Sequence, residues 1–380
     1  MKQIYLDNAA TTKVDEKVAE AMMPFYTEKY GNASSTHFLG EEARRAIEEA
    51  REIIAKSISA KYKEIIFTGS GTESNNMVIK GLYWANKDKG KNHIITTKIE
   101  HDCVLNACRW LETQGAEITY LNVDEKGFVN LEQLKDSITD KTIVVSIIHG
   151  NNEIGTIQDL EAIGKICKSR NVLFHTDACQ SYTKTELNVK KTNLDLITLN
   201  AHKIHGPKGV GALYIKEGVK ITPLLHGGGH EFKLRSSTEN VAGIVGFAKA
   251  VKLGMDVKKI KKLRDKIIEN ILNIPNTKLN GAIGDRRLCN NINVSFRNIE
   301  GESIGSFLNA KGIFISTGSA CSSHSLESSH VLLALGMSPL EANSSVRISI
   351  SKYTTEQEID YFLDELKKIV EKLRRISPIS

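Results

Sequence analysis

The sequence predicts an α/β fold, with a large domain built on a mainly parallel sheet and a smaller α+β domain. Short apolar runs alternate with helical patterns from Glu64 to Leu199, and this alternation is typical of parallel sheets that bind ligands at the carboxyl ends of their strands. After Pro275 the order of elements changes. The 380 residues, 41% of them apolar and 25% charged, provide ample material for two cores of a soluble globular protein.

The elements of the large domain follow from apolar periodicity and helix-ending residues. We expect a helix from Asp15 to Lys29, ended by Gly31, and another from about Gly40 to Ser57. Apolar runs that predict the strands of a seven-stranded type of sheet are Ile65–Thr68, Ile94–Thr97, Ile118–Leu121, Ile143–Ile148, Val172–Thr176, Leu194–Leu199 and Gly211–Ile215.

A long helical stretch is expected from about Glu239 to Ile274, where Pro275 would end it. The last helix opens with the capping box Thr355-Glu-Gln-Glu358. Beyond Pro275 we expect strands at Ile292–Phe296 and Val346–Ile350, and a helix at Glu302–Ala310. The expected division is a large domain at 15–253 and a small domain formed by 1–14 and 254–380.

Charge and composition argue against nucleic-acid and membrane partners. The net charge is +6, and the one dense lysine cluster, Lys258–Lys266, fits the solvated face of a helix. No apolar run is long enough to span a membrane, and the start of the chain does not resemble a signal peptide. The six cysteines lack the density of a disulfide framework, so we expect a reduced, cytoplasmic compartment.

Lys203 follows the expected strand Leu194–Leu199 and precedes a turn rich in Gly and Pro. A lysine held away from water loses stabilisation of its charged form, and its neutral amine can form a Schiff base with a carbonyl compound or with pyridoxal phosphate (PLP). The alternative is a lysine in a surface loop. Other segments decide between these two interpretations.

The segment Thr68-Gly-Ser-Gly-Thr-Glu-Ser-Asn-Asn76 joins a strand to a helix and suits a phosphate group. Backbone amides at a helix start, together with the Thr72 hydroxyl, favour an anion. The segment is not a dinucleotide fingerprint, because Ser74 occupies the place of the third glycine, and it lacks the Gly-Lys-Ser/Thr of a P-loop. A plain glycine turn is the alternative.

Two further strand ends carry polar side chains that suit a pyridine ring. Asp177 can pair with a protonated ring nitrogen, and Gln180 can donate to the phenolate oxygen of the ring. His101 can lie on the ring or move protons. The alternatives are a capping role for Asp177 and a structural role for His101.

Cys321 lies among small polar residues, which favours an exposed thiol that attacks a sulfur atom and carries the product away. The spacing to His324 resembles a metal motif but lacks a second pair of ligands. Arg347, on an expected strand, can bind a substrate carboxylate, and a structural ion pair is the alternative.

Taken together, these segments resemble the NifS/IscS-type cysteine desulfurases, PLP-dependent enzymes of the aminotransferase class-V group. The matching segments are Tyr5-Leu-Asp-Asn-Ala-Ala-Thr-Thr12, Gly71-Thr-Glu-Ser74, Glu100-His101, Asn151-Asn-Glu-Ile-Gly155, Asp177-Ala-Cys-Gln180, Ala201-His-Lys203, Gly206-Pro-Lys-Gly209, Gly227-Gly-Gly-His-Glu231, Arg235-Ser-Ser-Thr238 and Gly318-Ser-Ala-Cys321. They run nearly from end to end, in one order.

The resemblance implies a homodimer of PLP fold type I and a role for each matching residue. Lys203 would carry PLP, Asp177 would pair with its ring nitrogen, Gln180 would contact its phenolate oxygen and His101 would stack on the ring. Gly71, Thr72 and His202 would hold the phosphate, and Thr238 would reach the phosphate of the neighbouring subunit. Asn152, which also contacts the cofactor, and Arg347 would bind the substrate, and Cys321 would carry the persulfide. Asn200 stands where the family usually has a phosphate-binding serine, and its amide can substitute as a donor.

The expected reaction converts L-cysteine to L-alanine and leaves a persulfide on Cys321. The resemblance implies sulfur delivery to an iron–sulfur scaffold protein, and tRNA thiolation is another destination. No resident metal site is expected, apart from Cys321 as a transient iron–sulfur ligand. The alternatives are a selenocysteine lyase, a class-V aminotransferase, or a sulfur-transfer scaffold without turnover.

Overall fold

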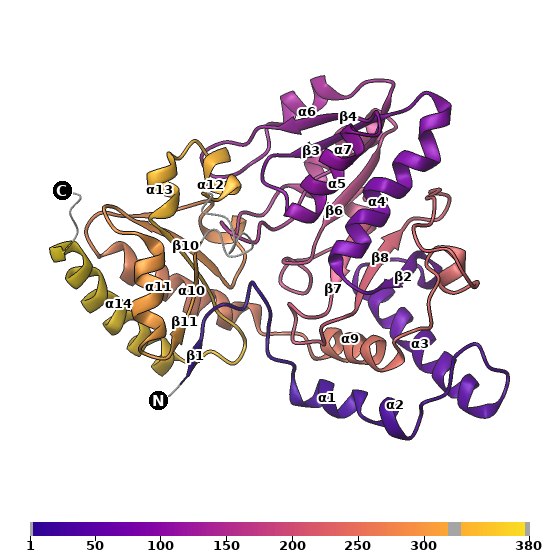
Figure 1. Ribbon diagram of the computed structural model, residues 1–380, viewed down its shortest axis with the longest axis horizontal. Helices are drawn as coiled ribbons and strands as arrows, with labels where there is room; N and C mark the ends of the chain where they lie inside the picture. Colours follow the sequence, from indigo (N-terminus) through magenta and orange to yellow (C-terminus); the bar gives the residue numbers. More distant parts are fainter. Residues whose placement is uncertain (1–2, 318–327, 377–380) are drawn as a thin grey trace.

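A seven-stranded sheet forms the centre of the larger part of the chain in the computed structural model, which describes residues 3–317 and 328–376 (Figure 1). Its order is β2-β8-β7-β6-β5-β3-β4. The strands are β2 (Ile65–Thr68), β3 (His93–Thr97), β4 (Glu117–Leu121), β5 (Thr142–Ser146), β6 (Leu173–Asp177), β7 (Leu196–Asn200) and β8 (Gly211–Ile215). Only the pairings of β8 are antiparallel, so the predicted, mainly parallel sheet is confirmed.

Helices cover both faces of this sheet, which explains why its strands are continuous apolar runs rather than alternating ones. Neighbouring side chains on one strand belong to different cores: Phe67 packs in the core with α3 (Phe38–Ser57), and Ile66 packs in the core with α4 (Gly71–Asn86). The other helices of this part are α5 (Asp102–Glu112), α6 (Leu131–Ser137), α7 (Leu160–Ser169), α8 (Val189–Thr192) and α9 (Val241–Leu253).

A second, antiparallel sheet lies in the smaller part of the molecule, with the order β12-β13-β10-β9. Its strands are β9 (Thr277–Leu279), β10 (Asn291–Phe296), β12 (Ser316–Thr317) and β13 (Ser345–Ser349). The helices of this part are α10 (Val257–Leu272), α11 (Gly301–Asn309), α12 (His330–Ala334), α13 (Pro339–Asn343) and α14 (Glu356–Ile376). The capping box of α14 is confirmed, because the amide of Thr355 donates to Glu358 Oε2 at 2.9 Å and the amide of Glu358 donates to Thr355 Oγ1 at 3.2 Å.

The start of the chain joins this smaller part. Strand β1 (Ile4–Tyr5) pairs in parallel with β11 (Ile313–Phe314), and Ile4 and Leu6 lie in the same core as α10, β10 and α14. We propose that the chain divides into the two predicted domains, 15–253 and 1–14 with 254–380. Among the described residues, three of the four hydrophobic cores support this division, since each takes its members almost entirely from one of the two predicted domains; the fourth core, which includes Ile99 and Leu332, draws on both.

The prediction of one long helix from Glu239 to Ile274 is wrong, because the structure has α9 and α10 there. Gly254 ends α9 with φ 57° and ψ −160°, a conformation that only glycine adopts readily. Asp256 then caps α10, since its side chain accepts a hydrogen bond from the amide of Lys259 at 3.0 Å. The apolar periodicity continues across the break and conceals it.

The expected first helix, from Asp15 to Lys29, is also divided in two. Helix α1 (Glu16–Met22) is followed by α2 (Pro24–Thr27), which ends before the predicted boundary. Pro24 has no amide hydrogen to donate to the carbonyl one turn earlier, so the α-helical ladder is interrupted there. The described residues also contain the 3₁₀ helices η1 (Tyr62–Glu64), η2 (Lys87–Lys89), η3 (Glu231–Lys233) and η4 (Gly284–Arg286). Within residues 3–317 and 328–376, no helix has the length and apolar character needed to cross a membrane.

Candidate active site

A cavity of about 210 Å³ lies at the carboxyl ends of β6 and β7, next to β13 of the smaller sheet. It brings together side chains from segments that are far apart in the sequence. The predicted site residues that line it are Gly71, Thr72, His101, Asn152, Asp177, Asn200, His202, Lys203 and Arg347. This is the edge of the sheet at which ligands bind in α/β proteins.

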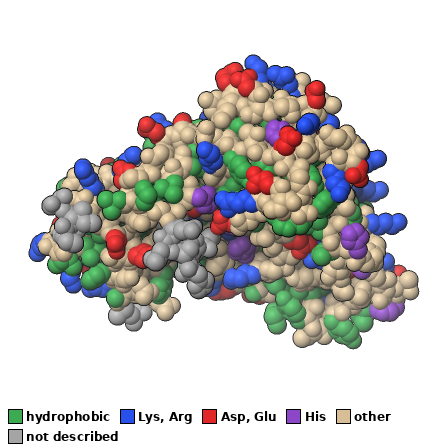
Figure 2. All heavy atoms as spheres, turned by 45° about the horizontal axis from the view of Figure 1, so that its top comes forward, with side chains coloured by type: hydrophobic (Ala, Val, Ile, Leu, Met, Phe, Trp, Pro, Cys, Tyr) green, Lys and Arg blue, Asp and Glu red, His purple; other side chains and the backbone are tan. Residues whose placement is uncertain are grey.

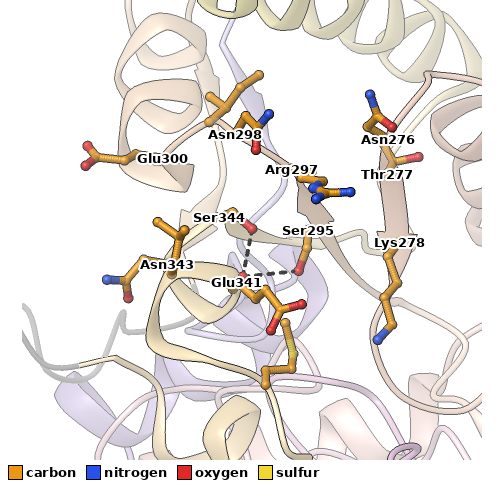
Figure 3. A pocket seen from close by; sticks show the side chains of 13 residues that line it. Asn276, Thr277, Lys278, Ser295, Arg297, Asn298, Glu300, Glu341, Asn343 and Ser344 are labelled. Carbon is orange, nitrogen blue, oxygen red and sulfur yellow. Dashed lines mark hydrogen bonds between the residues drawn. The ribbon is translucent and has the colours of Figure 1, made fainter. Parts of the chain in front are cut away.

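A larger cavity, of about 700 Å³, lies in the smaller part of the molecule between β9, β10 and α13 (Figure 3). Its polar side chains include Lys278, Arg297 and Glu300, and in Figure 3 the Oγ atoms of Ser344 and Ser295 point to the carbonyl oxygen of Glu341, at 2.7 and 3.5 Å. None of the predicted site residues lines it. Cavity volume therefore does not identify the candidate active site. The smaller cavity is the candidate, because the predicted site residues line it.

Lys203 lies in the turn that follows β7 and is half-buried, so the expectation of a lysine away from water is met only in part. Lys184 stabilises this turn through two hydrogen bonds. Its Nζ donates to the carbonyl oxygen of Gln180 at 2.7 Å and to that of Lys203 at 3.2 Å. Burial lowers the pKa of Lys184 to about 8. A buried amine thereby holds the backbone of the two segments that supply Asp177 and Lys203.

The first turn of α4 presents backbone amides to the cavity. Ser70 caps the helix by accepting a hydrogen bond from the amide of Glu73 at 3.1 Å, and Gly71 is the first helical residue. A Cβ atom at Gly71 would lie 2.6 Å from the sulfur of Cys179, so only glycine fits at this position. The first amides of a helix have no partner within it and attract anions such as phosphate.

Asp177 ends β6, and both of its carboxylate oxygens accept hydrogen bonds from the protein. Oδ1 accepts from the amide of Cys179 at 2.8 Å, and Oδ2 accepts from Nδ2 of Asn75 at 2.7 Å. The alternative role, a backbone cap, is therefore present as well. It does not exclude the predicted role, because the side chain also lines the cavity.

His101 is the N-cap of α5, and its hydrogen bonds define its tautomer. The ring atom Nδ1 accepts a hydrogen bond from the amide of Cys103 at 3.1 Å, so the proton of the neutral ring is on Nε2. Burial, and secondly the nearby Lys203, lower the pKa of His101. Burial and Lys203 also lower the pKa of His202, to about 4, and its Nδ1 lies 3.2 Å from Oγ1 of Thr11. Both rings are thus neutral at physiological pH.

Arg347, on β13, is 2% exposed and is held by two partners. One terminal nitrogen donates to Asp7 Oδ1 at 3.0 Å and the other to the carbonyl oxygen of Asn152 at 3.2 Å. Burial raises the pKa of Asp7 although Arg347 opposes this effect. The structural ion pair that was the alternative for Arg347 therefore exists, and its guanidinium also lines the cavity.

Two predicted site residues of the described chain, Gln180 and Thr238, do not line this cavity. Gln180 is buried, but its Nε2 donates to the carbonyl oxygen of Ala9 at 2.8 Å, so its contact with a cofactor stays a prediction. Thr238 is exposed on the surface, as a residue that serves a neighbouring subunit would be. Cys321 and His324 lie outside the described residues.

Sequence reasoning missed several residues that meet the predicted site residues. Asp7 and Asn75 contact Arg347 and Asp177, and the thiols of Cys103 and Cys179 line the cavity. Asp7 lies in the matching segment Tyr5–Thr12, and Asn75 lies in the expected phosphate-binding segment Thr68–Asn76. Their position in these segments was the only indication of a role in the site. Their partners are far away in the sequence, so their roles were not visible there.

The residues present fit PLP. The cavity offers an amine, a carboxylate, a helix start for a phosphate and a cation for a carboxylate. Oδ1 of Asn200 and Nε of Arg347 are buried without a hydrogen-bond partner among the described residues, and a buried polar atom left in this state costs about 1–3 kcal/mol. In the described part of the chain, no group of three His, Cys, Asp or Glu side chains could hold a metal ion.

Comparison with known proteins agrees with this site. The aminotransferase class-V family matches residues 4–362. Cysteine desulfurase IscS of Clostridium botulinum is 49% identical over 385 residues, which cover 100% of this chain and 97% of that protein. The solved structure of a NifS-like protein is 40% identical, with a TM-score of 0.91 and coverage of 98% of this chain and 100% of that one.

A second solved structure, SspA in complex with cysteine, is 38% identical, with a TM-score of 0.84 and coverage of 93% of this chain and 100% of that one. These neighbours confirm the predicted fold, PLP fold type I. The likeness extends over nearly the whole length of the chain and so includes its seven-stranded and four-stranded sheets. The chain therefore belongs to the aminotransferase class-V family and, within it, to the cysteine desulfurases.

Proposed function

We propose that this chain binds PLP through Lys203 and converts L-cysteine to L-alanine, with a persulfide formed on Cys321. The observation that carries the proposal is the single cavity that gathers Lys203, Asp177, His101 and Arg347 from four separate segments. The cysteine complex of the structural neighbour SspA supports the choice of substrate. The test is incubation of the purified protein with L-cysteine and a thiol reductant, followed by quantification of alanine and sulfide in equal amounts.

Each part of the cavity would hold one part of the cofactor. The amides at the start of α4, with Thr72 and His202, would hold the phosphate, and Asp177 would face the ring nitrogen. His101 would lie on the ring, and Gln180 would reach its phenolate oxygen. Asn200, in place of a serine, would offer the Nδ2 of its amide group as a donor. Bound PLP supplies an electron sink for the bond changes at the substrate.

Substrate orientation depends on Arg347 and Asn152. The guanidinium of Arg347 would bind the substrate carboxylate through two parallel hydrogen bonds, and Asn152 lies beside it. Lys203 would then move the proton at the α-carbon, since its amine lines the same cavity. His101 is neutral with its proton on Nε2. It can donate this proton to the substrate at the bond between Cβ and sulfur that breaks.

Sulfur would leave the substrate by attack of the Cys321 thiolate on the substrate thiol sulfur. An S–S bond forms and the bond between Cβ and sulfur breaks, and its electron pair stays on the carbon skeleton. That skeleton takes up a proton and becomes alanine, so the sum is cysteine plus enzyme thiol giving alanine plus enzyme persulfide. A thiol reductant, or an acceptor protein, then removes the terminal sulfur by thiol–disulfide chemistry.

Arg347→Lys is expected to lower kcat/KM for cysteine strongly while the absorbance of bound PLP stays unchanged. An ammonium cannot reproduce two parallel hydrogen bonds to a carboxylate, and charge-assisted hydrogen bonds are worth about 1.5–3 kcal/mol each, so a loss on the order of tenfold to several-hundredfold is expected. Steady-state kinetics with a PLP spectrum checks this result. Arg235→Lys and Lys352→Ala are the controls, because Arg235 pairs with Glu73 and Lys352 pairs with Asp15.

Near-normal activity of Arg347→Lys, together with loss in one of these controls, would place the carboxylate site elsewhere. Loss of bound PLP in Arg347→Lys would instead favour the purely structural ion pair with Asp7.

The proposed assembly is a homodimer in which Thr238 completes the neighbouring subunit's phosphate site. Exposed hydrophobic side chains support an interface at α1, α2 and the start of α3, where Phe38 is 72% exposed. Met23, Tyr26 and Tyr30 are also exposed there. Figure 2 shows hydrophobic side chains along the lower edge of the molecule, where α1 and α2 lie in Figure 1.

Thr238→Ala is expected to leave the dimer intact and to weaken PLP binding on the order of tenfold to a hundredfold, because one hydrogen bond to a charged group is worth about 1.5–3 kcal/mol. Light scattering measures the mass, and titration of the apoprotein measures PLP affinity. Ser237→Ala, at the adjacent exposed position, is the matched control. A monomeric wild-type protein that binds PLP normally would exclude this role of Thr238.

The proposed sulfur acceptor is an iron–sulfur scaffold protein, with tRNA thiolation as a further destination. The name of the relative, cysteine desulfurase IscS, and the resemblance of the cysteine segment support this acceptor. The cytoplasm is the proposed compartment, because its thiols are kept reduced and a persulfide can be passed on. Co-purification with identification of bound proteins tests the acceptor.

A further inference from the structure

Asn75 lies inside α4, one turn after the residues that start this helix, and its side chain is fully buried. Its Nδ2 donates to Asp177 Oδ2 at 2.7 Å and to the sulfur of Cys103 at 3.1 Å. The rotated amide would turn its oxygen toward the carboxylate, so Asp177 determines the orientation of the group. Oδ1 of Asn75 has no hydrogen-bond partner among the described residues, which leaves the contact with Asp177 as its main polar function.

Two donors therefore hold the carboxylate of Asp177 from the protein side. The amide of Cys179 holds Oδ1, and Asn75 holds Oδ2. Hydrogen bonds to a charged carboxylate stabilise its negative charge and prevent its rotation. The lone pairs that remain are free for a partner in the cavity that Asp177 lines.

Helix α4 connects this contact to the opposite end of the cavity. Gly71 and Thr72 line the cavity at the helix start, and Asn75 lies three and four positions later, on the same side of the helix. One rigid element thus carries both the expected phosphate site and the donor that holds Asp177. The distance between the expected phosphate site and Asp177 is therefore set by the geometry of one helix.

We propose that Asn75 is a positioning residue that holds the carboxylate of Asp177 in the orientation that faces the ring nitrogen of PLP. This inference rests on the proposed function, in which Asp177 pairs with that nitrogen. Asn75 would act through Asp177 alone. Its removal should weaken only those cofactor contacts that involve the ring nitrogen.

The test compares PLP with its 1-deaza analogue, which carries a C–H group in place of the ring nitrogen. Asn75→Ala removes the donor, and Asn75→Asp places a second carboxyl group against Asp177, where both cannot be ionised. Each variant is expected to bind PLP about tenfold more weakly than the wild type, because a charge-assisted hydrogen bond is lost, and to bind the deaza analogue as the wild type does. Fluorescence titration of the apoproteins measures both affinities, and thermal unfolding of the apoproteins reports the fold.

Asn86→Asp is the matched control, because Asn86 lies at the other end of α4 and, among the residues that the structure describes, its Nδ2 donates to the carbonyl oxygen of Leu82 alone, at 2.8 Å. It should bind both cofactors as the wild type does. Equal weakening of PLP and the analogue in the folded Asn75 variants would show a merely structural role and overturn the inference, as would unchanged PLP affinity. A wild-type protein that does not prefer PLP to the analogue would contradict the role of Asp177 itself. If Asn75→Asp fails to fold, Asn75→Ala alone decides between these outcomes.

Discussion

Replacement of Lys203 by alanine is expected to abolish covalent attachment of PLP and to reduce desulfurase activity on the order of 10³-fold or more, because Lys203 is both the attachment point and the group that moves the α-proton. Borohydride reduction of the wild type should fix the cofactor to one peptide. Peptide mapping by mass spectrometry checks that this peptide contains Lys203. In Lys203→Ala no peptide should carry the label.

Lys208 provides the matched control, because it lies in the same turn but its side chain is exposed. Lys208→Ala should retain the covalent cofactor and near wild-type activity. A borohydride label on Lys208 instead of Lys203 would contradict the assignment of the site.

Cys321→Ser is expected to bind PLP and L-cysteine but to release no sulfide above background. Serine cannot form a persulfide, so the sulfur has no acceptor on the enzyme, and the expected loss of turnover is on the order of 10³-fold or more. The measurement is sulfide and alanine release under a thiol reductant, with the PLP spectrum as evidence of an intact site.

Cys103→Ser and Cys179→Ser are the controls, since both thiols line the cavity. Burial raises the pKa of Cys103 to about 12 and that of Cys179 well above its usual value, so neither provides a thiolate near neutral pH. Both variants should therefore retain sulfide release. If Cys321→Ser turns over like the wild type and one of these variants does not, the persulfide is carried by a cavity thiol.

The strands of the large sheet were predictable because they are buried on both faces. Such strands appear in the sequence as short apolar runs, and β2 and β8 have the bounds that their runs predicted. Helix ends were predictable where a side chain caps the backbone, as Thr355 does for α14. The break at Gly254 was not, because a single left-handed residue leaves the apolar periodicity intact.

The candidate site was predictable at the positions where a motif and an element boundary coincide. Lys203 and Asp177 both follow apolar runs, and parallel strands place their carboxyl ends at one edge of the sheet. The cavity confirms that these two side chains lie together. The role of Gln180 did not follow in the same way, since its amide donates to Ala9.

The sequence by itself determined the fold class, the family and the side chains that can carry the chemistry, since these depend on local periodicity and on residue types in short segments. Only the tertiary structure decided which partners hold those side chains. Asp7 pairs with Arg347 because β1 pairs with β11 in the smaller part of the molecule, and Asn75 meets Asp177 because α4 packs beside β6. Such contacts join residues separated by most of the chain or by several strands, and no local pattern encodes them. Their geometry is set by how the helices and sheets pack.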